Sequence, residues 1–330
     1  MLRAGLILLA LIAVVGLADE MMMKRWHGAT APSTAAAASA AQPDSGGKHA
    51  KDDPPADEAS AQTAQCSVVQ PPRPLPSDLP EASGAAASVR TPGIVWVQND
   101  SRGPEIFAVA QDGTPRGRVR VTAAQAVDWE DLAMAPCDGG SCLYIGDVGD
   151  NAGKRAGVTV YRVHEPAPGD PATFPAEAFR ATYPDGSHDA EAIFALPQGG
   201  VFILTKGETG AAALYRYPEP MRGASTARLQ RVAEFSDARM KRSLRFTGAA
   251  ASPDGRWVAV RTLRSVHFYR AADLVAGRPG TPLEWDATPL GEKQGEGIAF
   301  ARGDTLILTS EGGAKRVPGT IERIACQLPR

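Results

Sequence analysis

The sequence predicts an all-β protein: a β-propeller of five blades with four strands each, with six blades as the alternative count. Apolar segments of one kind recur five times from residue 81 onward, at spacings of 47 to 61 residues. No amphipathic helix of convincing length follows residue 66, and 34 glycines and 27 prolines suit many turns. Units of about 40–50 residues built from short strands are typical of propeller blades.

Each unit opens with a short apolar strand that we expect to line the central axis. These strands are "SGAAAS" (83–88), "EDLAMAP" (130–136), "EAIFALP" (191–197), "TGAAAS" (247–252) and "EGIAFA" (296–301). Second strands follow at "GIVWVQND" (93–100), "CLYIGDVGDN" (142–151), "GVFILTK" (200–206), "RWVAVRT" (256–262) and "TLILTS" (305–310). Both sets are nearly all apolar, as strands covered on both faces should be.

The remaining strands complete each blade. Third strands are predicted at "EIFAVA" (105–110), "VTVYRV" (158–163), "ALYRY" (213–217), "VHFYR" (266–270) and "TIERIA" (320–325), with more polar strands such as "GRVRVTA" (117–123) between units. The ring must close, or one edge strand stays open. We expect "CSVV", from Cys66, to pair with "TIERIAC" and close it, so the propeller spans 66–330.

The four cysteines predict two disulfides. An even number in an exported chain favours disulfides. Cys137 and Cys142 flank the turn "DGGS" and would face each other across a hairpin, which leaves Cys66 to pair with Cys326. Zinc binding is the alternative, but the sequence has no second C-x-x-C pair and no nearby histidine cluster.

The N-terminal part predicts export. In residues 1–26, Arg3 precedes an apolar run from Ala4 to Ala18, which is shorter than the roughly 20 residues of a spanning helix. It is typical of a signal peptide cleaved after Ala18, with an uncleaved membrane anchor as the alternative. Residues 27–65 are rich in Ala, Pro and Ser and predict a disordered linker. We therefore expect a periplasmic or extracellular protein, attached to a membrane only through an N-terminal anchor.

Composition excludes one class of partner. The formal net charge of −2 gives no basic surface for a nucleic acid. We expect a monomer with a small-molecule or polymeric ligand that the sequence does not identify.

An acidic ring is the main functional candidate. The equivalent positions of the five inner strands hold Ser83, Glu130, Glu191, Thr247 and Glu296. Glu81 lies two residues before Ser83, hence on the same strand face, and adds a fourth carboxylate. Carboxylates crowded around an axis must protonate, pair with a cationic side chain or bind a cation. Oxygen ligands favour a hard cation, calcium before magnesium.

Two other sets of residues belong to this hypothesis. The end of the second strand of the second unit contributes Asp147, Asp150 and Asn151 as further metal ligands. His188, close to Glu191, is a weak candidate for a general base, and Glu191 is the other candidate catalytic residue. The alternative is structural pairing, in which Lys206 and Arg261, at the ends of second strands, neutralise the ring.

The chain also shows a family resemblance. "LPEASGAAASVRTPGIVWVQNDS", "DWEDLAMAP", "LYIGDVGDNAGKRAGVTVYRVHEP", "YPDGSHDAEAIFALP" and "GEGIAF…ILTSEGG" together resemble a group of exported bacterial β-propeller proteins of largely unknown function. The "E-G-I-A" units resemble, more loosely, the esterase-like phytase and the gluconolactonase and paraoxonase propellers. That resemblance implies a calcium ion in the channel and hydrolysis of phosphoesters, esters or lactones, with Glu130, Glu191 and Glu296 at the matching positions.

Three functions follow as hypotheses. The first is an exported propeller that binds a divalent cation and a ligand at an acidic axial channel. The second is a calcium-dependent hydrolase of phosphoesters, esters or lactones, and the third is a structural or protein-binding propeller of the cell envelope. A channel filled by Lys206 or Arg261 would favour the third.

Overall fold

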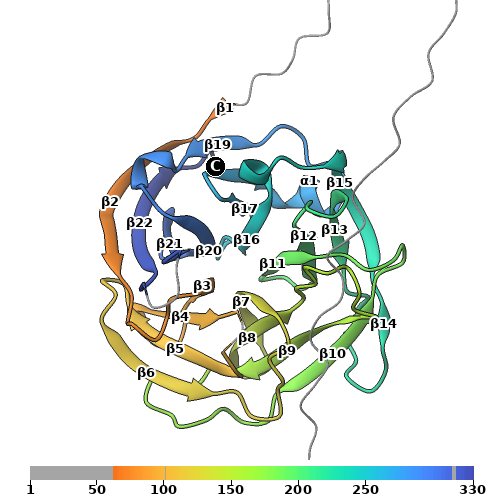
Figure 1. The fold of residues 1–330 in the computed structure, drawn as a ribbon, viewed down its shortest axis with the longest axis horizontal. Coiled ribbons are helices and arrows are strands. Elements are labelled where there is room, and N and C mark those ends of the chain that lie inside the picture. The colour runs from red at the N-terminus through yellow and green to blue at the C-terminus, as the bar shows by residue number, and fades with distance from the viewer. Residues whose placement is uncertain (1–61, 101, 314–316) are drawn as a thin grey trace, which may run out of the picture. The chain divides into compact units, whose positions relative to one another are not determined.

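The computed structural model describes residues 62–100, 102–313 and 317–330. They fold as a five-bladed β-propeller (Figure 1). Five blades are thus confirmed over six. The expected signal peptide or anchor (1–26) and most of the expected linker (27–61) lie outside the described residues. Within these ranges, no helix is long and apolar enough to cross a membrane.

The blades follow one another along the chain. Blade 1 comprises β3 (Ala82–Ala87), β4 (Ile94–Asn99), β5 (Glu105–Ala110) and β6 (Pro115–Arg120). Blade 2 comprises β7 (Trp129–Cys137), β8 (Gly140–Asp147), β9 (Val158–His164) and β10 (Glu177–Thr182), with the short β14 (Ala227–Arg228) at its edge. Blade 3 comprises β11 (Ala190–Ala195), β12 (Val201–Thr205), β13 (Ala211–Arg216) and β15 (Gln230–Arg239).

The last two blades include strands from the start of the described chain. Blade 4 comprises β16 (Phe246–Ala251), β17 (Trp257–Thr262), β18 (Ser265–Arg270) and β19 (Leu283–Asp286), with β1 (Gln62–Thr63) beside β19. Blade 5 comprises β20 (Gln294–Phe300), β21 (Thr305–Glu311), β22 (Thr320–Gln327) and β2 (Gln65–Pro74). The helical elements are short: η1 (Arg242–Leu244), α1 (Ala271–Val275) and η2 (Thr288–Leu290).

The ring closes where the sequence places the closure. β2 pairs antiparallel with β22, and Cys66 lies opposite Cys326 in that register. The structure contains both expected disulfides, Cys66–Cys326 and Cys137–Cys142. Strand pairing begins earlier than expected, because residues 62–65 of the expected linker already contribute β1 and the first residue of β2. Backbone hydrogen bonds to β19 order this stretch, although it has no large apolar side chain.

The core consists of five hydrophobic clusters, one between each pair of neighbouring blades. Trp96 of blade 1 packs with Leu143 of blade 2, for example, and Phe194 of blade 3 packs with Val258 of blade 4. Both faces of the inner and middle strands are therefore covered, which explains their nearly unbroken apolar sequences. This packing fixes the five inner strands, β3, β7, β11, β16 and β20, around one axis (Figure 1).

Candidate functional site

A β-bulge interrupts every inner strand at the same place. Pairing with the second strand skips the equivalent positions, which are Ser83, Glu130, Glu191, Thr247 and Glu296. A bulge leaves its extra residue unpaired and re-aims the side chain. The five positions that the repeat aligns are thus also the five positions where the backbone departs from the regular ladder.

The two hydroxyl residues of this set join neighbouring blades. Ser83 Oγ donates a hydrogen bond to the Glu130 carbonyl oxygen at 2.6 Å, which links blade 1 to blade 2. Thr247 Oγ1 donates to the Gly295 carbonyl oxygen at 2.9 Å, which links blade 4 to blade 5. Among the described residues, the carboxylates of the three glutamates make no such hydrogen bond to the backbone of a neighbouring blade.

Glu130 is buried among other carboxylates. Its side chain lies against Gly149 together with Asp128, so a Cβ on that glycine would overlap both carboxylates. Burial raises the pKa of Glu130 well above its ordinary value, and the charges of Glu191, Asp128 and Asp189 raise it further. Ser83 Oγ, at 3.5 Å, is its hydrogen-bond donor among the described residues, so no cationic side chain is in direct contact with it there.

Glu191 has a cationic partner. Lys206, which directly follows β12, forms an ion pair with it and lies 3.7 Å from Asp189 Oδ2 and 3.3 Å from Glu208 Oε2. Burial raises the pKa of Glu191 to about 7 although Lys206 opposes the shift. Burial lowers the pKa of Lys206, but the surrounding carboxylates outweigh it and raise that pKa above its ordinary value, so the lysine is charged at neutral pH. Lys206 therefore neutralises part of the ring, as the structural alternative expects.

Glu296 forms the other side of the ring. Its carboxylate accepts a hydrogen bond from Gln294 Nε2 at 2.6 Å. Burial raises its pKa well above the ordinary value, and Glu191 and Glu311 add to the shift. Glu311, at the end of β21, has its pKa raised to about 7 by burial and by the nearby charges of Asp100 and Glu81. Glu81 itself is half-buried and forms an ion pair with Arg102 at 3.1 Å.

The three expected ligands near the end of β8 have other partners. Asp147 forms an ion pair with Arg155 at 2.8 Å and accepts a hydrogen bond from the N–H of Asp128. Asp150 accepts hydrogen bonds from the N–H groups of Lys154 and Arg155, both at 2.8 Å. Asn151 is exposed, with its Oδ1 3.5 Å from Lys206 Nζ. These side chains therefore shape the loop beside the ring.

Two further residues of the hypothesis have their described contacts away from the ring glutamates. His188 Nε2 lies 2.9 Å from Asp185 Oδ1 and 3.1 Å from the Tyr215 hydroxyl, and its described contacts include no axial carboxylate. Arg261 is fully buried but pairs with Glu292 and donates to the Gly297 carbonyl oxygen, so its partner is not a glutamate of the ring.

Sequence reasoning missed Asp128 and Asp189. Each lies two residues before a ring glutamate, which is the spacing that singled out Glu81, so the same signal could have found them. Asp189 is 2% exposed, and its Oδ1 accepts a hydrogen bond from the N–H of Asp150 at 2.7 Å. Its Oδ2 is buried and has no hydrogen-bond partner among the described residues.

The ring opens into a cavity of about 360 Å³. Glu191, Thr247 and Glu296 contribute its inner wall, and Lys206 and Arg245 reach it from the surrounding segments. The donors available to a metal are carboxylate oxygens, which suit calcium. In the described part of the chain, however, no three carboxylate groups bring their oxygens within 4.8 Å of one another. A cation here would need side-chain rotation or water in part of its coordination shell.

Comparison with known proteins supports the fold. No protein-family model and no curated protein match the sequence. The major allergen Mala s 1 of Malassezia sympodialis has a similar structure, with a TM-score of 0.52 and 10% identity over 78% of this chain and 95% of the allergen. At this identity the likeness shows the fold alone.

Two other solved structures are more distant. The gluconolactonase XC5397 from Xanthomonas campestris gives a TM-score of 0.42 and 12% identity, over 82% of this chain and 99% of that one. The calcium-binding protein regucalcin from Agrobacterium tumefaciens gives 0.44 and 14%, over 78% and 95%. The strand arrangement defines the chain as a β-propeller, and its two disulfides indicate an oxidising, extracytoplasmic compartment.

Proposed function

We propose that this protein is an exported binding propeller whose acidic axial ring takes a divalent cation, calcium before magnesium, and with it a small or polymeric ligand. One observation carries the proposal. Glu130, Glu296 and Glu311 are held where each has a raised pKa, while Lys206 pairs with Glu191 on one side of the group. A raised pKa means that these carboxylate charges repel one another and are poorly solvated. A divalent cation would neutralise them more effectively than protons at neutral pH.

Asp189 supports the proposal independently. A buried carboxylate oxygen without a hydrogen-bond partner costs free energy unless another group satisfies it. Oδ2 of Asp189 is such an atom, and Lys206 Nζ is 3.7 Å away, beyond hydrogen-bonding distance. Glu130, Asp128 and Asp189 are the residues that would hold the cation. The charges of Asp128 and Asp189 raise the pKa of Glu130, and the charge of Asp189 raises the pKa of Asp128, while the ion pair of Lys206 lies with Glu191.

The test is thermal unfolding of the full chain with and without calcium at pH 8. A ligand that binds only the native state at a hundred times its Kd stabilises that state by about 2.7 kcal/mol, so the melting temperature should rise with calcium and fall with a chelator. Glu130→Gln should remove most of the calcium effect while raising stability without calcium, because it removes one repelling charge. Glu177→Gln, at an exposed ion pair on β10, is the matched control and should keep the calcium effect.

An unchanged melting temperature in saturating calcium, or an equal calcium effect in the Glu130→Gln variant, would contradict the proposal. In either case the third hypothesis, a structural or protein-binding propeller neutralised by Lys206, would account for the ring better.

A second candidate function is hydrolysis of phosphoesters, esters or lactones, and Glu191 is the observation that favours it. Its pKa of about 7 is suited to general acid–base catalysis at neutral pH. His188 is not part of this candidate, because its contacts lie with Asp185 and Tyr215. A substrate panel with calcium should show turnover that Glu191→Gln abolishes. Turnover that survives both Glu191→Gln and Glu130→Gln would rule out catalysis at this pocket.

A further inference from the structure

The axial channel has a second, apolar cavity that shares no lining residue with the polar cavity beside the glutamate ring. Its volume is about 270 Å³, and all five inner strands contribute small or apolar side chains to its wall. One such residue from each blade is Ala85, Leu132, Ala195, Ala250 and Ala299. The alanines that recur in the inner-strand repeat therefore have a shared location, and the acidic pocket does not use them.

Close backbone contact separates the two cavities. A Cβ on Gly84 would lie 2.6 Å from the Cα of Asp131, and a Cβ on Gly248 would lie 2.5 Å from the Glu296 carbonyl oxygen. Neither position has room for a side chain, because real Cβ contacts are longer than 3.0 Å. The inner strands thus pack backbone against backbone between the acidic pocket and the apolar cavity, and the apolar cavity is a site of its own.

A larger and more polar cavity adjoins the apolar one. It has a volume of about 750 Å³ and shares Ala87, Val89, Pro253 and Phe300 with its neighbour. Arg302 and Arg323 line it, and neither cavity is lined by any acidic residue. Arg323 Nε is buried without a hydrogen-bond partner among the described residues, and Arg302 is exposed with no ion pair there. The rim of the apolar cavity therefore carries positive charge that no carboxylate in its lining neutralises.

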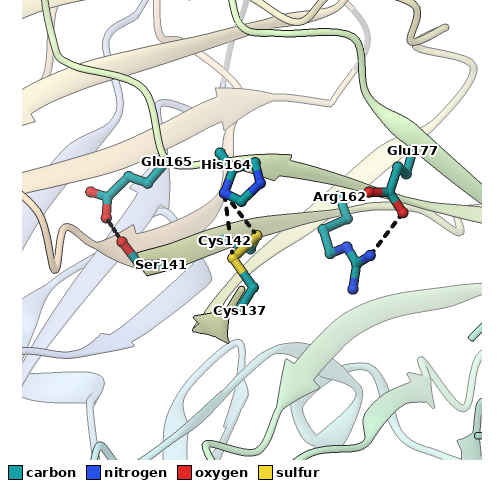
Figure 2. The surroundings of a disulfide bond; sticks show 7 residues. All are labelled: Cys137, Ser141, Cys142, Arg162, His164, Glu165 and Glu177. Atoms are coloured by element: carbon teal, nitrogen blue, oxygen red, sulfur yellow. Dashed lines mark hydrogen bonds and ion pairs between the residues drawn. A yellow bond between two sulfur atoms is a disulfide. The ribbon is translucent and has the colours of Figure 1, made fainter. Parts of the chain in front are cut away.

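The wall between blades 1 and 2 is held in place by buried polar contacts. Glu165 is 4% exposed and accepts hydrogen bonds from the hydroxyls of Ser88 and Ser141. Ser88 follows β3, and Ser141 lies in the β7–β8 hairpin, which also carries the Cys137–Cys142 disulfide. Figure 2 shows Glu165 and Ser141 beside that disulfide. One buried carboxylate and one disulfide thus hold in place Ser141, which lines the apolar cavity, and Ser88, which lines the adjoining polar cavity.

We propose that this end of the channel binds a small amphipathic anion, with a single alkyl chain in the alanine-lined cavity and a carboxylate head at Arg302 and Arg323. Removal of the chain from water drives its burial in an apolar cavity. The absence of acidic residues from the lining and the two arginines select an anionic head, since charge-assisted bonds from arginine to a carboxylate are strong. Small-molecule sites typically have volumes of about 300–1,000 Å³. The larger cavity, at about 750 Å³, lies within that range, and the apolar cavity, at about 270 Å³, lies just below it.

The test uses decanoate, below its aggregation concentration, as the probe in calorimetric titration of the full chain. We expect one decanoate per chain, no measurable binding of acetate, and at least about tenfold weaker binding of decyltrimethylammonium. The comparison with acetate tests whether binding needs the alkyl chain, and the comparison with decyltrimethylammonium tests whether it needs a negatively charged head. Failure of decanoate to bind, or equal binding of the ammonium compound, would overturn the proposal.

Variants locate the site. Arg302→Gln should weaken decanoate binding about tenfold, whereas Arg222→Gln, an exposed arginine that lines neither cavity, should leave it unchanged. Ala87 lies where the two cavities meet, so Ala87→Phe should keep the alkyl chain of decanoate out of the apolar cavity. The melting temperature of this variant checks that it folds. Unaltered decanoate affinity in a folded Ala87→Phe variant and in Arg302→Gln would place the binding elsewhere and overturn the assignment.

Discussion

Asp131 on β7 accepts a hydrogen bond from the backbone N–H of Ala249 on β16 at 3.1 Å, so one side chain joins blade 2 to blade 4. The same carboxylate accepts bonds from the N–H groups of Ile193 on β11 at 3.0 Å and of Leu132 at 2.8 Å. Burial raises its pKa well above the ordinary value, and these three donors oppose the shift. Asp131 occupies the place that Gly84, Gly248 and Gly297 occupy in other blades.

Asp131→Asn should therefore destabilise the propeller. An amide offers one oxygen in place of two, so at least one buried backbone N–H loses its acceptor at a cost of about 1–3 kcal/mol. Urea unfolding would measure the loss. Asp138→Asn, at an exposed aspartate in the adjacent hairpin, is the control and should leave the unfolding midpoint unchanged. Equal midpoints for the two variants would contradict the bridging role of Asp131.

The two disulfides should contribute unequally to the free energy of unfolding. Cys66–Cys326 spans 260 residues and closes the ring, whereas Cys137–Cys142 spans 5. The chain-entropy model gives about 5.5 kcal/mol for the long loop and about 2 kcal/mol for the short one. Replacing Cys66 and Cys326 with serine should lower the free energy of unfolding much more than replacing Cys137 and Cys142. A larger loss from the hairpin pair would show that ring closure does not depend on the long bridge.

Stability should fall as the pH rises from about 5 to 8 in the absence of divalent cations. Glu191 and Glu311 have folded-state pKa values of about 7, above the ordinary 4.5, so between these values the folded protein holds more protons than the unfolded chain. Glu130 and Glu296 act in the same direction. Burial lowers the pKa of His267 and acts in the opposite direction, but the four carboxylates outweigh one histidine.

Thermal unfolding monitored by circular dichroism at pH 5 and pH 8, with chelator present, would measure this dependence. Glu311→Gln should flatten it, since the variant cannot lose a proton at that position. A melting temperature that rises steadily from pH 5 to pH 8 would mean that the axial carboxylates are already neutralised within the chain.

Much of the architecture was predictable because it depends on repetition. The recurrence of Ser83, Glu130, Glu191, Thr247 and Glu296 at one place in the repeat predicted five blades, and all five positions prove to be bulges. Ring closure followed from the need to cover an edge strand and from the cysteine count.

The detailed contacts were not predictable, because they depend on which groups converge in space. Regular strand alternation would place the side chains of Asp131 and Glu130 on opposite faces of the strand. The bulge at Glu130 changes this alternation, and Asp131 then reaches the backbone of the other inner strands while Glu130 joins the ring. Asp147 and Asp150 lie near the ring in sequence, but their carboxylates are taken by the N–H groups of their own loop and by Arg155. Lys206 was recognised as a possible counter-ion, and the structure identifies Glu191 as its partner.

Lys206→Met should lower stability without calcium and enlarge the effect of calcium. The variant leaves Glu191 and Asp189 buried without their cation, and breaking a buried ion pair costs about 3 kcal/mol. A calcium ion could then replace part of the lost charge. Melting temperatures at pH 8 with and without calcium, compared with Lys241→Met at an exposed lysine, would measure both effects. A calcium effect no larger than that of the unmodified chain would contradict competition between the lysine and the cation.

The most direct test of the acidic pocket is a crystal structure of the full chain grown with saturating calcium. The account predicts an ion on the channel axis, bonded at about 2.3–2.6 Å to carboxylate oxygens of the group formed by Glu130, Asp128 and Asp189, with water completing its coordination. A pocket in which Lys206 Nζ and water alone contact these carboxylates under that condition would contradict the proposed function.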